Sequence, residues 1–174
     1  VYVHLPWCVR KCPYCDFNSH EAGGALPETA YVGALVRDLD ADLAVLPARP
    51  VTSVFIGGGT PSLFSAGAIG GILEAIDGGP GLAAGCEITL EANPGASERA
   101  RFAGYRAAGV NRLSIGAQSF RDDRLQVLGR IHDARAVIAA FEAARAAGFD
   151  NVNLDLMYAL PGDDAAGAMQ DLDA

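Results

Sequence analysis

Short β-type runs alternate with longer helical patterns along the chain, and this alternation constrains the fold more than any other feature. The expected strands are short and rich in β-branched residues, and they cover residues 2–5, 53–56, 87–90, 112–115 and 152–156. The expected helices cover residues 27–46, 66–76, 98–108 and 134–147. A strand–helix–strand repeat builds a parallel sheet with right-handed crossovers, so we predict an α/β fold that forms part of a (β/α) barrel.

The composition fits one folded domain and excludes several classes of protein. The 174 residues are 51% hydrophobic and 20% charged, which is enough apolar surface for a core and argues against disorder. The net charge of −8 argues against a binder of nucleic acids or anionic membranes. We find no signal peptide and no apolar run long enough for a transmembrane segment. Lys11 is the only lysine among 13 basic residues, which we attribute to compositional bias.

Three of the four cysteines, Cys8, Cys12 and Cys15, lie within eight residues directly after the first expected strand. Crowded thiols in a chain without a secretion signal indicate a metal site, a cluster or a redox pair rather than structural disulfides. The spacing favours an iron–sulfur cluster in which one iron has no protein ligand. A zinc site completed by His4 or His20 is the main alternative, and a redox dithiol is a weaker one.

Glycines or polar residues stand at the ends of all five expected strands. In α/β barrels the chemistry gathers at the carboxyl ends of the strands, so these residues are expected to surround one opening. Besides the cysteine loop they are the run Gly57-Gly58-Gly59-Thr60, Glu91, Gln118 and Asp155. One such end alone is best explained as a structural turn, whereas five together favour a site. The glycine run matches neither a P-loop nor a dinucleotide-binding motif, which argues against phosphate binding.

Six segments, in the same order, resemble motifs of the radical S-adenosylmethionine (SAM) superfamily. Within that superfamily they are similar to the group that contains the oxygen-independent coproporphyrinogen III oxidases and the HemW-type haem chaperones. They are residues 12–19, 56–62, 90–95, 114–120, 128–132 and 153–157. The resemblance implies a partial (β/α)6 barrel. Residues 1–174 would then be an incomplete radical SAM core domain that stops after the fifth strand and its following helix, without the sixth strand and a C-terminal domain.

The resemblance also implies the cofactors and their contacts. Cys8, Cys12 and Cys15 would hold a [4Fe–4S] cluster whose open iron binds SAM, and reduction of the cluster by an external electron donor would cleave SAM. The implied SAM contacts are Tyr2, the backbone at Tyr14, Gly58, Gly59, Thr60, Glu91, Gln118, Arg130 and Asp155. Without the resemblance, the residues alone favour a surface ion pair of Arg130 with Asp122 or Asp133.

One difference from the oxidase motif distinguishes the two subgroups. The oxidases typically carry a further cysteine two positions after the third, where this chain has Phe17, and residues 16–19 resemble the haem chaperones. The resemblance therefore implies a cytoplasmic protein that binds haem and delivers it to haem-requiring proteins, with haem determinants in a C-terminal region. A coproporphyrinogen oxidase and a zinc-stabilised α/β binding module are the alternatives. No catalytic residue is assigned, and the chaperone role is preferred over an enzymatic one.

Overall fold

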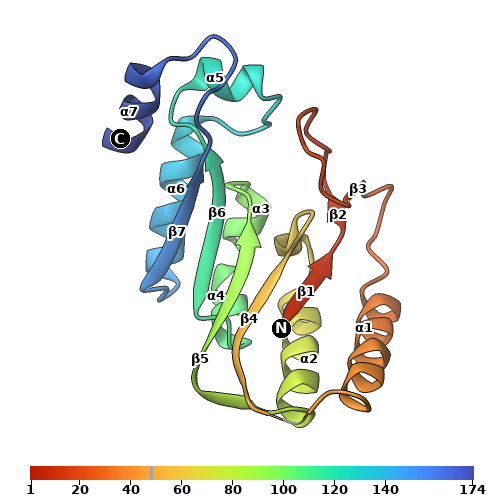
Figure 1. Cartoon of the computed structure of the whole chain (residues 1–174). Coiled ribbons are helices and arrows are strands. Elements are labelled where there is room, and N and C mark those ends of the chain that lie inside the picture. Colours follow the sequence, from red (N-terminus) through yellow and green to blue (C-terminus); the bar gives the residue numbers. More distant parts are fainter. Residues whose placement is uncertain (48) are drawn as a thin grey trace.

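A computed structural model describes residues 1–47 and 49–174, apart from the side chains of residues 96 and 97 (Figure 1). Its main sheet has five parallel strands in the order β1 (Tyr2–Leu5), β4 (Val51–Gly58), β5 (Leu82–Ala92), β6 (Arg112–Gln118) and β7 (Asn151–Leu156). A second, two-stranded parallel sheet pairs β2 (Trp7–Cys8) with β3 (His20–Glu21). All five predicted strands are present, so the predicted α/β fold with a parallel sheet is confirmed.

Helices connect the strands, and three of the four predicted ones are single helices as expected: α1 (Glu28–Leu43), α2 (Ala66–Gly78) and α6 (Ala134–Ala146). The expected helix 98–108 is wrong as one element, because the chain forms α3 (Ala96–Arg99) and α4 (Phe102–Ala107) with a turn between them. The 3-10 turn η1 (Pro61–Leu63), α5 (Asp122–Val127) and α7 (Ala165–Asp173) complete the structure. No helix in the described ranges is long and apolar enough to cross a lipid bilayer.

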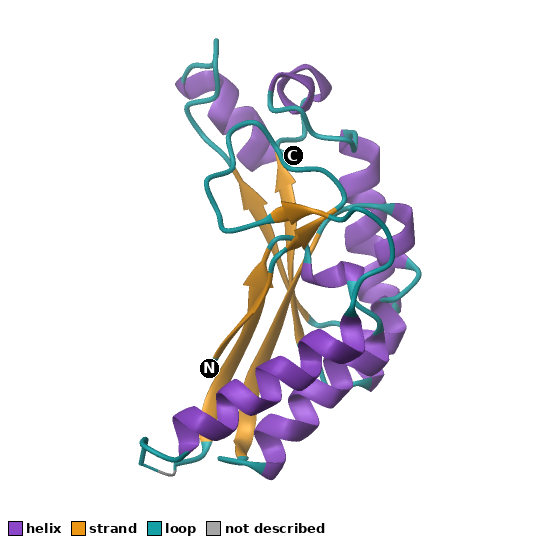
Figure 2. Ribbon diagram, turned by 90° about the vertical axis from the view of Figure 1, so that its right-hand side faces the viewer, coloured by secondary structure: helices purple, strands orange, loops and turns teal. Residues whose placement is uncertain are grey.

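The helices cover one face of the main sheet and leave the other face open (Figure 2). Strand side chains alternate between the two faces. Those that point toward the helices form the core, among them Val54, Ile56, Leu90 and Leu113, which are fully buried or nearly so. The open face instead carries aromatic and polar side chains, so it is the face that is available for ligands.

The strand register aligns the polar residues of the open face in a row. His4 lies opposite Gly57 across β1 and β4, and Glu91 lies opposite Ser114 across β5 and β6. Ser114 in turn lies opposite Asn153 on β7. This row stands near the carboxyl ends of β1, β4 and β5, and it crosses β6 and β7 nearer their middle.

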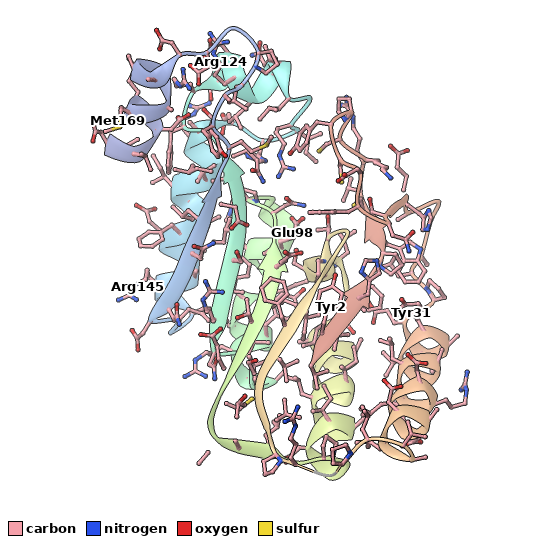
Figure 3. The ribbon with its side chains drawn as sticks, in the orientation of Figure 1. Tyr2, Tyr31, Glu98, Arg124, Arg145 and Met169 are labelled. Carbon is pink, nitrogen blue, oxygen red and sulfur yellow. The ribbon has the colours of Figure 1, made fainter. Side chains whose placement is uncertain are left out.

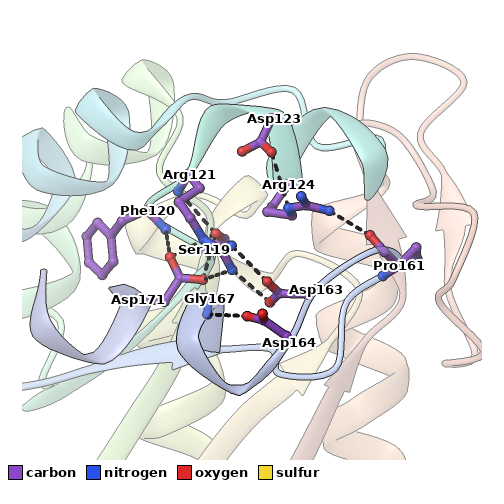
Figure 4. Close-up of polar contacts among 10 residues, drawn as sticks. All are labelled: Ser119, Phe120, Arg121, Asp123, Arg124, Pro161, Asp163, Asp164, Gly167 and Asp171. Atoms are coloured by element: carbon purple, nitrogen blue, oxygen red, sulfur yellow. Dashed lines mark hydrogen bonds and ion pairs between the residues drawn. The ribbon is translucent and has the colours of Figure 1, made fainter. Parts of the chain in front are cut away.

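A buried ion-pair network fastens the loop after β6 to the segment after β7 (Figure 4). The Arg121 guanidinium donates two hydrogen bonds of 2.8 Å to Asp163 and one of 3.0 Å to Asp171. Asp171 also accepts from the Ser119 hydroxyl at 2.8 Å and the Phe120 amide at 2.7 Å. Burial alone would raise the pKa of Asp171, but these hydrogen bonds hold the pKa below its ordinary value. Asp171 is therefore a charged anchor for α7.

Buried hydrogen bonds also fasten the turn that follows the glycine run. The Tyr105 hydroxyl on α4 is fully buried and lies 2.7 Å from the Ser62 carbonyl and 2.8 Å from the Phe64 carbonyl. Burial raises the pKa of Tyr105 to about 12, so the hydroxyl stays protonated and can donate. Arg101 donates to the carbonyls of Ser62 and Leu63 at 3.0 and 2.6 Å. Arg101 stands at the break between α3 and α4, and these two bonds explain why the chain turns there.

We expect Tyr105→Phe to destabilise the fold by about 1–3 kcal/mol, since it keeps the buried ring and removes the donor from two carbonyls. The free energy of unfolding in urea measures this effect. Tyr158→Phe is the matched control, because Tyr158 is 82% exposed. Equal unfolding free energies for wild type and Tyr105→Phe would contradict the role of this hydroxyl.

Candidate functional site

A cavity of about 450 Å³ opens at the carboxyl ends of the strands. Its walls come from the cysteine loop between β2 and β3 and from the ends of β4, β5, β6 and β7. All of the predicted site residues except Tyr2 line it: Cys8, Cys12, Tyr14, Cys15, Gly58, Gly59, Thr60, Glu91, Gln118, Arg130 and Asp155. Residues that are distant in sequence are thus brought together as predicted.

Tyr2 is not among the residues that line this cavity. Figure 3 shows its side chain on β1. Its ring lies on the open face near the start of β1, stacked on Phe55 with 6.3 Å between ring centroids. Its hydroxyl is 2.9 Å from Nδ1 of His4. Partial burial, followed by the nearby Glu91 carboxylate, raises the pKa of Tyr2. Tyr2 therefore adjoins the site through His4 and Glu91.

The cysteine loop is closed by the short β2–β3 ladder, which pairs Cys8 with Glu21. Within the loop the Cys15 amide donates to the Cys12 carbonyl at 3.1 Å, and the Ala22 amide donates to the Cys8 carbonyl at 2.8 Å. All four cysteines of the chain are free thiols. The ladder therefore presents three unpaired thiols to one cavity.

The thiol set suits an iron–sulfur cluster, and His4 is not free to complete a zinc site. Within residues 1–47 and 49–174, no three His, Cys, Asp or Glu side chains are grouped as ligands of a single metal ion. Both ring nitrogens of His4 are hydrogen-bonded, to the Tyr2 hydroxyl at 2.9 Å and to the Asn18 carbonyl at 2.8 Å, which leaves none for zinc. In a four-iron cluster each thiolate binds a different iron, so three separated thiols are the expected donor set.

Arg130 reaches into the cavity from the turn after α5. Its Nη2 donates to Oδ1 of Asn93 at 2.6 Å and to the Gly116 carbonyl at 2.9 Å, and its Nη1 is 3.4 Å from Sγ of Cys12. Its Nε is buried and finds no partner among the described residues. A buried unsatisfied N–H beside a cavity suits an incoming acceptor such as a carboxylate.

The surface ion pair that the residues alone suggested for Arg130 is therefore wrong. Asp133 instead caps α6 by accepting from the Ala136 amide at 2.8 Å, and it pairs with Arg135 at 3.3 Å. Asp122 accepts from the Ala134 amide at 2.9 Å. Neighbours in sequence suggested these pairs, whereas the turn after α5 directs Arg130 inward.

Two carboxylates line the wall opposite the cysteine loop. Glu91 accepts from the Gly58 amide at 3.2 Å, and Asp155 accepts from the Ser114 hydroxyl at 3.1 Å and from Nδ2 of Asn153 at 2.6 Å. Burial raises the pKa of Glu91, the Gly58 hydrogen bond offsets part of this effect, and the charge of Asp155 raises the pKa further. A ligand carrying a positive charge or hydroxyl groups would stabilise the charged form of Glu91.

Gln118 has a left-handed backbone, with φ of 70°, at the end of β6. Such a conformation is rare for a residue other than glycine and costs of the order of 1–3 kcal/mol. It follows an irregularity in the β6–β7 register between Ile115 and Gln118. The Met157 amide donates to the Gln118 carbonyl at 2.9 Å. This bond and the adjacent Arg121 network hold the strained residue at the cavity.

The glycine run is required by chain packing, and Gly58 and Gly59 also line the cavity. The Gly59 amide donates to the Leu5 carbonyl at 2.9 Å, and the Thr60 amide donates to the Trp7 carbonyl at 2.7 Å. A Cβ atom at Gly59 would stand 2.6 Å from the Trp7 carbonyl oxygen, and Gly58 has a φ of 119°. Only glycine permits both features. The structural explanation of this run therefore applies, and close approach of a ligand to Gly58 and Gly59 stays a prediction.

Three further residues have site roles that the sequence interpretation did not assign: Asn93 and Ser114, which line the cavity, and Asn153, which does not. Asn93 links two predicted contacts, because it donates to the Thr60 hydroxyl at 2.9 Å and accepts from Arg130. Ser114 and Asn153 orient Asp155. The sequence pattern that could have identified them is a polar residue that alternates with apolar residues along a strand, because such residues point to the open face.

Comparisons with known proteins agree with this geometry. The Radical SAM superfamily model matches residues 2–173. The chain is 49% identical over 172 residues to the haem chaperone HemW of Escherichia coli (strain K12), a match that covers 99% of this chain and 46% of that protein. It is 44% identical over 161 residues to the mitochondrial radical S-adenosyl methionine domain-containing protein 1 of Bos taurus, covering 92% of this chain and 36% of that protein.

The solved structure of coproporphyrinogen III oxidase (HemN) from Escherichia coli superposes with a TM-score of 0.86 at 28% identity, over 99% of this chain and 40% of that one. The chain thus spans less than half the length of the relatives it matches. The match over nearly the whole chain, together with the thiol-lined cavity at the strand ends, shows that the chain belongs to the radical SAM superfamily.

Proposed function

We propose that the cavity holds a [4Fe–4S] cluster on Cys8, Cys12 and Cys15, with SAM bound beside it. The observation that carries this proposal is one cavity lined by three free thiols, two carboxylates and Arg130. A cluster bound there supplies the electron that cleaves SAM, as the superfamily implies. The residues of this chain bind and orient the two groups.

The charges of the lining suit the groups that SAM carries. Arg130 has an unpartnered Nε and suits the carboxylate of the methionine part. Glu91 and Asp155 suit the sulfonium or the ribose hydroxyls. We infer that Gly58, Gly59, Thr60, Gln118 and the backbone at Tyr14 complete the SAM contacts. Tyr2 would act on the ligand through Glu91 and His4.

We propose that residues 1–174 are the radical SAM core of a longer protein. The chain spans 46% of the bacterial relative named above. β7 stands at the edge of the sheet and pairs only with β6 among the described strands, so its free edge can accept a sixth parallel strand. A C-terminal domain would then cover part of the open face.

For the whole protein we propose haem binding and delivery to haem-requiring proteins, with an external electron donor for the cluster. The 49% identity to a haem chaperone supports this function over decarboxylation of coproporphyrinogen, and so does Phe17, which lines the cavity where oxidases typically carry a cysteine. We place the protein in the cytoplasm, since the thiols must stay reduced to bind iron. The oxidase function is the second candidate, favoured by the structural likeness to HemN.

Incubation of the full-length protein with SAM, a reductant and coproporphyrinogen III distinguishes these two functions. We expect stable haem binding in a parallel titration and no decarboxylated porphyrin by mass spectrometry. Coproporphyrinogen oxidase serves as the positive control for the reaction conditions. Formation of decarboxylated product would contradict a purely chaperone role.

Arg130→Ala is expected to weaken SAM binding by about 1.5–3 kcal/mol, the scale of a hydrogen bond to a charged group, or roughly 10- to 150-fold in Kd. Isothermal titration of the cluster-loaded protein measures this loss. Arg135→Ala is the matched control, because the Arg135 side chain is 91% exposed and pairs with Asp133 at the surface. Unchanged SAM affinity of Arg130→Ala at equal iron content would overturn the proposed contact.

A further inference from the structure

The only lysine of the chain lies inside the cysteine loop. Twelve arginines supply every other basic side chain, yet the residue before Cys12 is Lys11. Its Nζ donates to the Phe17 carbonyl at 3.1 Å and to the Ser19 carbonyl at 3.2 Å. These bonds join a point just before Cys12 to a point just after Cys15. The ammonium group thus closes the segment that carries two of the three thiols.

The turn that receives Lys11 is tight and partly buried. The Phe17 carbonyl also accepts from the Ser19 amide at 2.7 Å and from the Ser19 hydroxyl at 3.4 Å. Ser19 is 3% exposed, and its hydroxyl is 4.0 Å from Sγ of Cys15. A displacement of this turn would therefore move the Cys15 thiol.

The backbone of Lys11 is held as well as its side chain. Its amide donates to Oε1 of Glu21 at 3.0 Å, and Glu21 pairs with Cys8 in the β2–β3 ladder. Lys11 therefore connects the ladder beside Cys8 to the turn after Cys15. The positions of all three thiols depend on elements that this one residue touches.

The geometry explains why arginine does not stand here. Two carbonyls from residues two positions apart converge on one nitrogen, which suits the compact ammonium with its three donors. A guanidinium is planar and longer, and its parallel N–H bonds match carboxylates rather than two converging carbonyls. The compositional preference for arginine is thus overridden at this position.

We propose that Lys11 is a positioning residue for the cluster, whose ammonium fixes the loop that presents Cys12 and Cys15. This inference rests on the proposed cluster. A loop that is held in its ligating conformation before iron arrives loses less conformational freedom on binding, so the cluster is retained more firmly.

The test compares the rate of iron release to a chelator from anaerobically reconstituted wild type, Lys11→Met and Lys11→Arg in the full chain. We expect both variants to release iron about fivefold faster or more, the factor that one lost hydrogen bond gives. Arg135→Met is the matched control, because it removes a cation whose side chain is 91% exposed and which does not line the cavity. We expect it to release iron at the wild-type rate.

Melting temperatures of the iron-free proteins show that each variant folds. Wild-type release rates in Lys11→Met, or full recovery of the wild-type rate in Lys11→Arg, would overturn the positioning role. Failure of the wild type itself to take up iron would instead contradict the proposed cluster. The two failures are therefore distinguishable.

Discussion

The parallel pairing of the five strands is the constraint on which the rest of the structure depends. Parallel strands place all of their carboxyl ends at one edge, and the helices that connect them cover only one face. Side chains alternate along each strand, so that they point in turn to the core under the helices and to the open face. Glu91, Ser114 and Asn153 meet across neighbouring strands because of this register.

The loops at the carboxyl edge of the sheet form a site only because buried polar contacts hold them in place. Tyr105 and Arg101 fasten the turn after β4, and the Arg121 network fastens the loops after β6 and β7. Arg130 then bridges the cysteine loop, β5 and β6 through Cys12, Asn93 and Gly116. Arg121 and Arg130 each donate to acceptors from different elements, which a planar fork of donors does well.

The sequence was sufficient for the five strands of the main sheet, for helices α1, α2 and α6, and for many of the residues that line the cavity. Hydrophobic periodicity reports local structure, and the six family segments report which residues share a site. The sequence was insufficient where a contact between distant segments determines the local structure. The break between α3 and α4 depends on Arg101 bonding to a distant turn, and the inward direction of Arg130 depends on the turn after α5. The two-residue ladder of β2 and β3 is too short to leave a periodic pattern.

The central claim is that Cys8, Cys12 and Cys15 hold a [4Fe–4S] cluster with one iron open to SAM. Electron paramagnetic resonance of the reconstituted, reduced protein before and after SAM addition tests it most directly. We expect a resonance signal from the cluster in the wild type that SAM alters. We also expect absorbance at about 400 nm in the wild type and its loss in Cys12→Ala. A protein that forms no cluster, that keeps it in Cys12→Ala, or whose signal SAM leaves unchanged would contradict the account.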